Sequence, residues 1–154
     1  MATYDLEFKG YYLSAEKLPE ETGVYLVYTC VYNESTQKRT INKLLYIGKS
    51  QKTDNTNLRK EVKQHVENGR FDSSIKAGEQ LCFSYALCDG RSLDVVENSL
   101  IYMQSGLINK TLLYSFKHES SLPVTLNIIG KCLLLDKTTF KIVKNAATGK
   151  IQVL

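Results

Sequence analysis

Two runs rich in β-branched and aromatic residues, separated by a short polar segment, constrain this chain more than any other feature. The first run, GVYLVYTCVY at 23–32, and the second, NKLLYIG at 42–48, are typical of β-strands. The polar segment NESTQKRT at 33–40 connects them and is longer than a tight two-residue turn. The sequence therefore predicts an antiparallel hairpin in the first third of the chain.

Other elements are predicted on both sides of this hairpin. Residues 4–13 alternate weakly between apolar and polar, which indicates an edge strand or a strand-like arm. Asn57 is a suitable N-cap for a helix over 58–68, which Gly69 would end. A third strand is predicted over 81–88.

The second half of the chain adds one helix and further strands. The helix begins at Ser92 or Asp94 and runs to about residue 104, because apolar residues recur on one face of it. Strands are expected over 124–135 and 140–154. Strands and helices in this order, with an early antiparallel hairpin, favour an α+β fold over a doubly wound parallel sheet.

Length and composition favour one domain over residues 1–154, since a chain of 154 residues can bury a sizeable core. No apolar run approaches the roughly 20 residues that cross a bilayer, and the N-terminus lacks a signal-peptide pattern. A cytoplasmic protein without a membrane partner is expected. The cysteines, which form no C-x-x-C pair, are expected to be reduced thiols: Cys30, Cys82, Cys88 and Cys132.

Positive charge is concentrated in one segment. Residues 38–63 carry eight basic residues against two acids, a net charge of +6, whereas the whole chain has a formal charge of +4. A basic stripe on a nearly neutral body is the pattern expected for binding a phosphate backbone, although a solvated lysine-rich face is a common alternative. The nucleic-acid contacts expected in this stripe are Lys49, Lys52, Arg59, Lys60 and Lys63.

Two tripeptides in the predicted hairpin carry a family resemblance. GVY at 23–25 and YIG at 46–48 resemble the signature tripeptides of the GIY-YIG nucleases, with Val in place of Ile in the first. Glu97 and Asn109, twelve residues apart, also match the spacing of that family, and His65 lies in the helix after the YIG strand. The resemblance implies a GIY-YIG-like core over 18–110: a small mixed or antiparallel sheet flanked by helices. Extra β-strands at 111–154 would extend it.

The resemblance also implies a function, namely a Mg²⁺- or Mn²⁺-dependent endonuclease with DNA as its partner. Glu97 would hold the metal ion, and a tyrosine would take a proton from the attacking water. Because a phenol has an ordinary pKa near 10, nearby cations must lower it, and Lys49 is suitably placed. Tyr25 is the expected base and Tyr46 its supporter, although the two roles are interchangeable. The catalytic residues implied are Tyr25, Tyr46, Lys49, His65, Glu97 and Asn109.

One position departs from the family pattern. The family carries an arginine four residues before the histidine, where this chain has Glu61. Arg59 and Lys60 point in other directions around a helix, so neither replaces that arginine directly. An alternative is therefore a catalytically inactive GIY-YIG-like domain that binds nucleic acid or a protein. A third possibility is an unrelated α+β binding domain.

Overall fold

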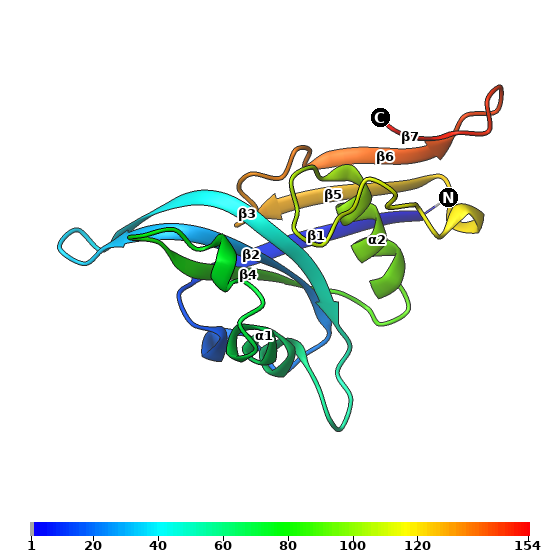
Figure 1. Cartoon of the computed structure of the whole chain (residues 1–154). Helices are drawn as coiled ribbons and strands as arrows, with labels where there is room; N and C mark the ends of the chain where they lie inside the picture. The colour runs from blue at the N-terminus through cyan, green and yellow to red at the C-terminus, as the bar shows by residue number, and fades with distance from the viewer. Residues whose placement is uncertain (1) are drawn as a thin grey trace.

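The computed structural model describes residues 2–154, and within them seven strands form one curled mixed sheet that carries two α-helices (Figure 1). The strands are β1 (Ala2–Tyr12), β2 (Gly23–Asn33), β3 (Lys38–Ser50), β4 (Gln80–Leu87), β5 (Val124–Gly130), β6 (Thr139–Lys144) and β7 (Ile151–Val153). The helices are α1 (Leu58–Glu67) and α2 (Leu93–Met103), with short 3-10 turns η1 (Ala15–Lys17), η2 (Asp72–Ser74) and η3 (Glu119–Ser121). The order across the sheet is β3-β2-β4-β1-β5-β6-β7. The α+β prediction is confirmed.

The predicted hairpin is present and is longer than expected. Strands β2 and β3 pair antiparallel from Gly23 opposite Ser50 to Asn33 opposite Lys38. The polar connection is therefore confined to residues 34–37, which is still longer than a two-residue turn, and Asn33 Oδ1 accepts hydrogen bonds from the backbone of Ser35 and Thr36 within it. Polar residues extend the strand here because the outer half of β3 is exposed to solvent.

The first strand is not at the edge of the sheet, so that prediction is wrong. Strand β1 lies between β4, with which it is antiparallel, and β5, with which it is parallel. The parallel partner comes from the other end of the chain, with Ala2 opposite Val124. A local sequence pattern contains no information about a partner so distant, because hydrophobic alternation reports which face is buried and not which strand lies alongside.

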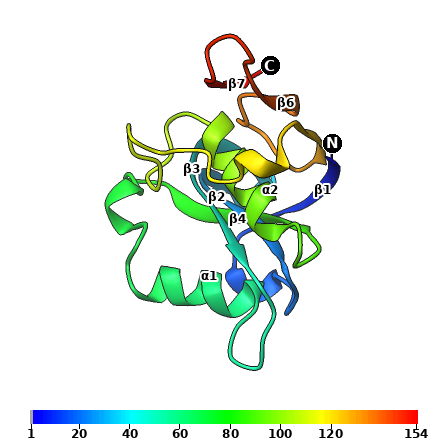
Figure 2. The ribbon, with the colours of Figure 1, turned by 90° about the vertical axis from the view of Figure 1, so that its right-hand side faces the viewer.

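The two helices cover opposite faces of the hairpin. Successive side chains of a strand point to opposite faces. In β2, Tyr25 and Val27 belong to the apolar cluster under α1, whereas Leu26 belongs to the cluster under α2. Both faces are covered, so eight consecutive residues of β2 are buried. Figure 2 shows α1 and α2 as separate bodies on the sheet, with β6 and β7 on the side of α2.

Helix α1 has the ends that the sequence predicts. The Asn57 side chain accepts a hydrogen bond of 3.0 Å from the backbone of Lys60, as an N-cap does. Gly69 follows the helix with a φ of +73°, a conformation that favours glycine. Near the C-terminus, a turn before Gly149 divides the region 140–154, expected to be strand, into β6 and β7.

Two sequence-based expectations concern the whole chain. Within residues 2–154, neither α-helix has the length and apolar character required to span a bilayer. Every cysteine in this range is a free thiol, and Cys30, Cys82 and Cys132 are buried.

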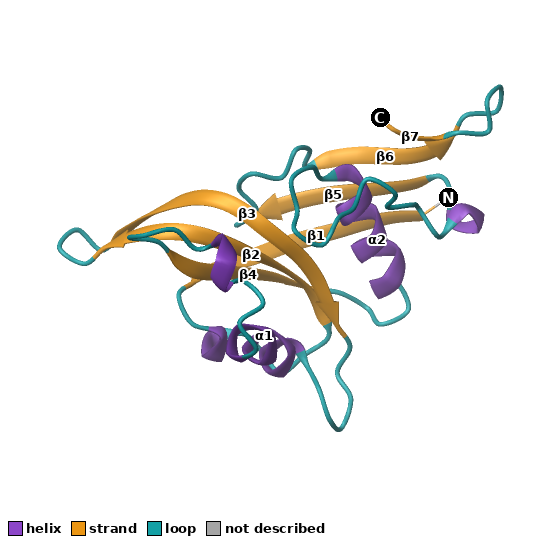
Figure 3. Cartoon of the chain, viewed as in Figure 1, coloured by secondary structure: helices purple, strands orange, loops and turns teal. Residues whose placement is uncertain are grey.

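Loops, drawn teal in Figure 3, connect the helices and strands, and the longest follows α2 and reaches η3.

Candidate active site

Two tyrosines from the hairpin form the centre of the candidate site. Tyr25 in β2 lies opposite Gly48 in β3, and its ring stacks on that of Tyr46 with centroids 5.9 Å apart and planes 20° from parallel. A Cβ atom at Gly48 would lie 2.3 Å from Tyr25 Cζ and 2.7 Å from Tyr46 Cε1. Only glycine leaves room for both rings. Tyr25 is fully buried, and Tyr46 is 8% exposed.

Helix α1 brings an acid and a histidine to these rings. The Tyr25 hydroxyl donates a hydrogen bond of 3.0 Å to Glu61 Oε2. One turn further along the helix, the His65 ring lies 5.8 Å from that of Tyr46. Burial raises the pKa of Glu61, while the hydrogen bond from Tyr25 and the charge of Lys49 oppose that rise. Glu61 therefore faces the site from the position where the resemblance expects an arginine.

Helix α2 contributes the carboxylate expected to hold a metal ion. Glu97 Oε1 lies 3.7 Å from Lys49 Nζ, and Lys49 also pairs with the exposed Asp94. Burial raises the pKa of Glu97, and the charge of Lys49 opposes this rise, whereas the charges of Asp94 and Glu61 add to it. Glu61 comes from α1 and Glu97 from α2, yet the charge of Glu61 contributes to the raised pKa of Glu97.

An arginine that the sequence did not single out completes this environment. Arg70 is exposed, and its Cζ atom lies 5.0 Å from the centroid of the Tyr46 ring, as in a cation–π contact. Burial raises the pKa of Tyr46, and the charge of Arg70 opposes that rise. Burial and the charge of Arg70 both lower the pKa of His65. Within residues 2–154 Arg70 forms no ion pair, so its charge is free to meet an anion.

The position of Arg70 follows from the end of α1. Gly69 turns the chain back, and the Arg70 backbone N–H bonds the His65 carbonyl at 3.1 Å. The sequence does contain a signal, because a basic residue directly after a helix-ending glycine lies near the last turn of the helix. That signal is weak, since basic residues are common there.

The Asn109 side chain bonds the backbone of β3 rather than a side chain of the site. Its Nδ2 donates a hydrogen bond of 2.8 Å to the Ile47 carbonyl, between Tyr46 and Gly48 in β3. The backbone N–H of Ile108 bonds the Leu45 carbonyl at 2.8 Å, so the loop after α2 lies along the outer edge of β3. Asn109 therefore positions the strand that carries Tyr46.

Most of the basic residues expected to bind nucleic acid are paired with acids near η1. Arg59 donates to the Leu18 carbonyl at 2.8 Å and pairs with Glu20 at 3.0 Å. Lys52 lies 3.8 Å from Glu21, and Lys63 pairs with Glu16. Lys60 is exposed, and Lys49 faces Glu97. The positive charge of residues 38–63 is thus partly neutralised by acidic residues at 16–21.

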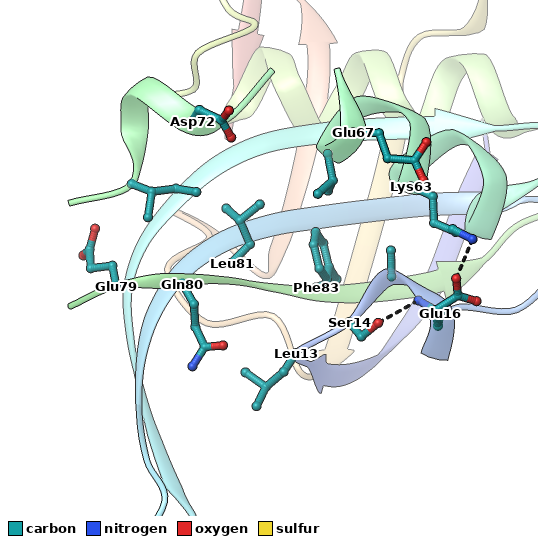
Figure 4. A pocket seen from close by; sticks show the side chains of 13 residues that line it. Leu13, Ser14, Glu16, Lys63, Glu67, Asp72, Glu79, Gln80, Leu81 and Phe83 are labelled. Atoms are coloured by element: carbon teal, nitrogen blue, oxygen red, sulfur yellow. Dashed lines mark hydrogen bonds and ion pairs between the residues drawn. The ribbon is translucent and has the colours of Figure 1, made fainter. Parts of the chain in front are cut away.

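A groove of about 490 Å³ opens on a different side of α1 (Figure 4). Lys63 and Glu67 line it, together with Leu81 and Phe83 of β4. These two helix residues follow Glu61 and His65 by two positions each, which is about 200° around a helix. Lys63 therefore points away from the tyrosines, and Figure 4 shows it turned toward Glu16.

Two carboxylates near β3 are the candidate ligands for a hard cation. Glu97 and Glu61 provide carboxylate oxygens, which Mg²⁺ prefers. In residues 2–154 no group of three or more His, Cys, Asp or Glu side chains is arranged to hold a metal ion. A magnesium ion at Glu97 would need waters and substrate phosphates as its other ligands, which Mg²⁺ commonly uses beside one or two carboxylates.

In comparisons with protein-family profiles, with curated proteins and with solved structures, nothing matches this chain. The geometry at the edge of β3 and the residues of the two tripeptides therefore provide the basis for a functional proposal.

Proposed function

We propose that this chain is a metal-dependent DNA endonuclease of the GIY-YIG type. The observation that carries the proposal is the pairing of Tyr25 with Tyr46 across Gly48, with Glu97 and Lys49 at the same end of β3. A nuclease needs a proton acceptor for water, positive charge for the phosphoryl oxygens and a carboxylate for a metal ion. The described residues at this edge include a candidate for each role.

Tyr46 is the better candidate for the proton acceptor. The Tyr25 hydroxyl donates a hydrogen bond to Glu61, and burial together with the charge of Glu61 raises the pKa of Tyr25 far above its ordinary range. Burial also raises the pKa of Tyr46, but Tyr46 is slightly exposed and lies under Arg70, whose charge opposes that rise. We therefore assign the base to Tyr46 and the supporting role to Tyr25, the reverse of the order first expected.

Positive charge comes from two directions. Arg70 lies over one face of the Tyr46 ring, and Lys49 lies beside Glu97. Cations placed where charge develops stabilise the phosphoryl oxygens of a phosphodiester during attack by water. Arg70, which follows α1, supplies the positive charge that an arginine at position 61 would supply in the family.

Glu97 is the residue that would hold a Mg²⁺ ion. When bound, such an ion supplies Lewis-acid stabilisation of a phosphoryl oxygen and of the leaving group. Lys49 competes for the same carboxylate, since its ammonium lies 3.7 Å from Glu97 Oε1. The side chain of Lys49 must therefore move aside or share the carboxylate when a cation binds.

Nicking of supercoiled plasmid tests the proposal. We expect conversion to nicked and linear forms with Mg²⁺ or Mn²⁺ and none with EDTA. Intact supercoiled DNA under both conditions, at protein concentrations where binding is complete, would contradict an active nuclease.

A catalytically inactive binding module is the second candidate. Two observations favour it. Lys49 forms ion pairs with both Asp94 and Glu97, and position 61 is a glutamate where the family has an arginine. This candidate predicts salt-dependent binding to DNA, measured by fluorescence anisotropy, without cleavage in any divalent metal.

A further inference from the structure

The groove shown in Figure 4 has an apolar floor. Its volume of about 490 Å³ lies within the range of roughly 300–1,000 Å³ that is usual for ligand pockets. Phe83 is buried beneath it, whereas four aliphatic residues of the lining are only half-buried: Leu13, Val66, Ile75 and Leu81. This floor is therefore available to the apolar part of a ligand.

The rim of the groove is acidic. The lining contains one basic residue and four acids, a net charge of −3, although the whole chain has a formal charge of +4: Lys63 against Glu16, Glu67, Asp72 and Glu79. Lys63 pairs with Glu16, so the lining, all within the described residues 2–154, provides no base for the other three carboxylates. Hydrogen bonds from the Asn42 side chain and the Lys76 backbone lower the pKa of Glu79, which keeps it ionised at neutral pH. The rim therefore attracts a cationic ligand.

One edge of β4 is open where it borders the groove. On one side, β4 pairs with β2 as far as Gln80 opposite Cys30. On the other side, β1 ends at Tyr12 opposite Phe83, and the chain turns away into η1. In the part of the chain that the structure describes, residues 80–82 have a strand on one side only, and no loop forms a backbone hydrogen bond with them. Unpaired backbone groups at such an edge are a template for an added strand.

The face of β4 that carries α1 combines the floor and the rim. Leu81 and Phe83 lie on this face, because residues two apart in a strand point the same way, and Figure 4 shows Gln80 turned to the opposite side. Glu67 of α1 and Asp72 of η2 border the groove on this same face. Lysine and arginine have an apolar stem and a charged head. Alternate basic residues of an added strand would thus place their stems on the floor and their heads at these carboxylates.

We propose that the groove binds a basic peptide segment of a partner protein, which adds to the sheet as an extended strand along residues 80–82 of β4. The open edge favours a peptide over a small organic cation, since only a peptide backbone supplies the N–H and carbonyl groups of a ladder. The acidic rim repels nucleic acid. This site is separate from the proposed nuclease site and does not depend on that function.

A dye-labelled peptide of alternating lysine and valine, about six residues long as a typical strand is, serves as the probe. Fluorescence anisotropy with the full chain, at physiological ionic strength, should show saturable binding. NMR should place the largest shifts of backbone amides at residues 80–82. The double variant Glu67→Lys/Asp72→Lys should weaken binding about tenfold or more, because both carboxylates face the bound cations.

The matched control is Glu34→Lys/Asp54→Lys. It changes the net charge by the same amount at exposed positions outside the groove. Since salt screens distant charges, it should leave the affinity of the peptide unchanged. Equal affinity of Glu67→Lys/Asp72→Lys and the unsubstituted chain overturns the acidic groove as the site.

N-methylation of the peptide tests the added strand itself. Only alternate N–H groups of a strand face its neighbour, so methyl groups on the backbone nitrogens of the lysines, or of the valines, block the ladder in one case and not in the other. We expect one methylated peptide to lose binding and the other to retain it, and equal affinity of the two overturns strand addition. No saturable binding of the unmethylated peptide overturns the whole proposal and leaves the nuclease proposal standing. A dimer in sedimentation that the peptide converts to a monomer identifies a second copy of this chain as the occupant, which also contradicts the proposal.

Discussion

The Tyr25 hydroxyl donates a hydrogen bond to the Glu61 carboxylate and so joins β2 to α1 inside the candidate active site. Glu61 holds a fully buried phenol in place and keeps its proton on the oxygen. The acid therefore has a positioning role that an arginine at this position would not perform in the same way. In the proposed site Tyr25 is therefore the supporting residue, and Tyr46 lies under Arg70, which forms no ion pair within residues 2–154.

Replacement of Glu61 by Gln should make the protein more stable at neutral pH. Burial raises the pKa of Glu61 above its ordinary 4.5, so the ionised form is less favourable in the folded chain than in the unfolded one. The contribution of Glu61 to the free energy of unfolding is therefore fully present below pH 4.5. It is lost as the pH rises through the pKa of Glu61 in the folded chain. Glutamine stays neutral and still accepts the bond from Tyr25. Urea unfolding between pH 4 and pH 8 measures the difference.

The advantage of Glu61→Gln should vanish in acid, where both side chains are uncharged. Glu34→Gln, at an exposed turn residue, is the control and should show no comparable trend. A Glu61→Gln variant that is less stable than the unsubstituted chain at pH 7 would mean that pairing of Glu61 with nearby cations outweighs the cost of burying its charge.

Alanine at Gly48 should separate the two tyrosine rings. The new Cβ would lie 2.3 Å from Tyr25 Cζ, so a ring must shift. Overpacking of this kind costs about 1–3 kcal/mol of the free energy of unfolding, which denaturant titration measures. Gly90→Ala is the matched control, because its new Cβ meets only the flexible Gln51 side chain, at 3.1 Å. Equal stability of the two variants would show that the ring pair does not require glycine.

Replacement of Arg70 by Gln should raise the pKa of His65 and slow cleavage. Burial and the charge of Arg70 both lower the pKa of His65, so removal of the charge moves it upward, as NMR titration of the imidazole would show. Loss of a preorganised positive contact to the phosphate should reduce the cleavage rate about 100-fold. Arg59→Gln is the control, since Arg59 is held by Leu18 and Glu20. If Arg59→Gln abolishes cleavage and Arg70→Gln does not, Arg59 is the phosphate ligand.

Replacement of Lys49 by Met should strengthen metal binding while it weakens catalysis. The Lys49 ammonium lies 3.7 Å from Glu97 Oε1 and repels a cation approaching that carboxylate. After screening by solvent, its removal should tighten Mn²⁺ binding by about tenfold in calorimetry. Lys43→Met, at an exposed position of the same strand, should leave the affinity unchanged. Weaker Mn²⁺ binding in Lys49→Met would place the cation elsewhere.

Local elements were predictable because their signals are local. The β-branched and aromatic run at 23–32, the N-cap at Asn57 and the stop at Gly69 each depend on neighbouring residues, and each is present in the structure. The side of α1 that carries Glu61 and His65 also follows from helical periodicity. The resemblance implied one site for Tyr25, Tyr46, His65, Lys49 and Glu97. The structure brings Tyr25, Tyr46 and His65 together and places Lys49 beside Glu97.

Features that depend on distant contacts were not predictable. Strand β1 is central because β5 pairs with it from the far end of the chain. Glu20 and Glu16, near η1, pair with Arg59 and Lys63, which were expected to contact nucleic acid. Arg70 contacts Tyr46 because Gly69 reverses the chain after α1, whereas the resemblance places the arginine within α1, at position 61.

Cleavage by two carboxylate variants of α2 tests the central claim most directly. Glu97 and Asp94 lie one turn apart and both face Lys49, but Asp94 is largely exposed. We predict that the unsubstituted chain and Asp94→Asn nick supercoiled plasmid in Mg²⁺ or Mn²⁺, and that Glu97→Gln does not. Nicking by Glu97→Gln at the unsubstituted rate, in metal that EDTA removes, would contradict the assignment of Glu97 as the metal ligand and the nuclease site built around it.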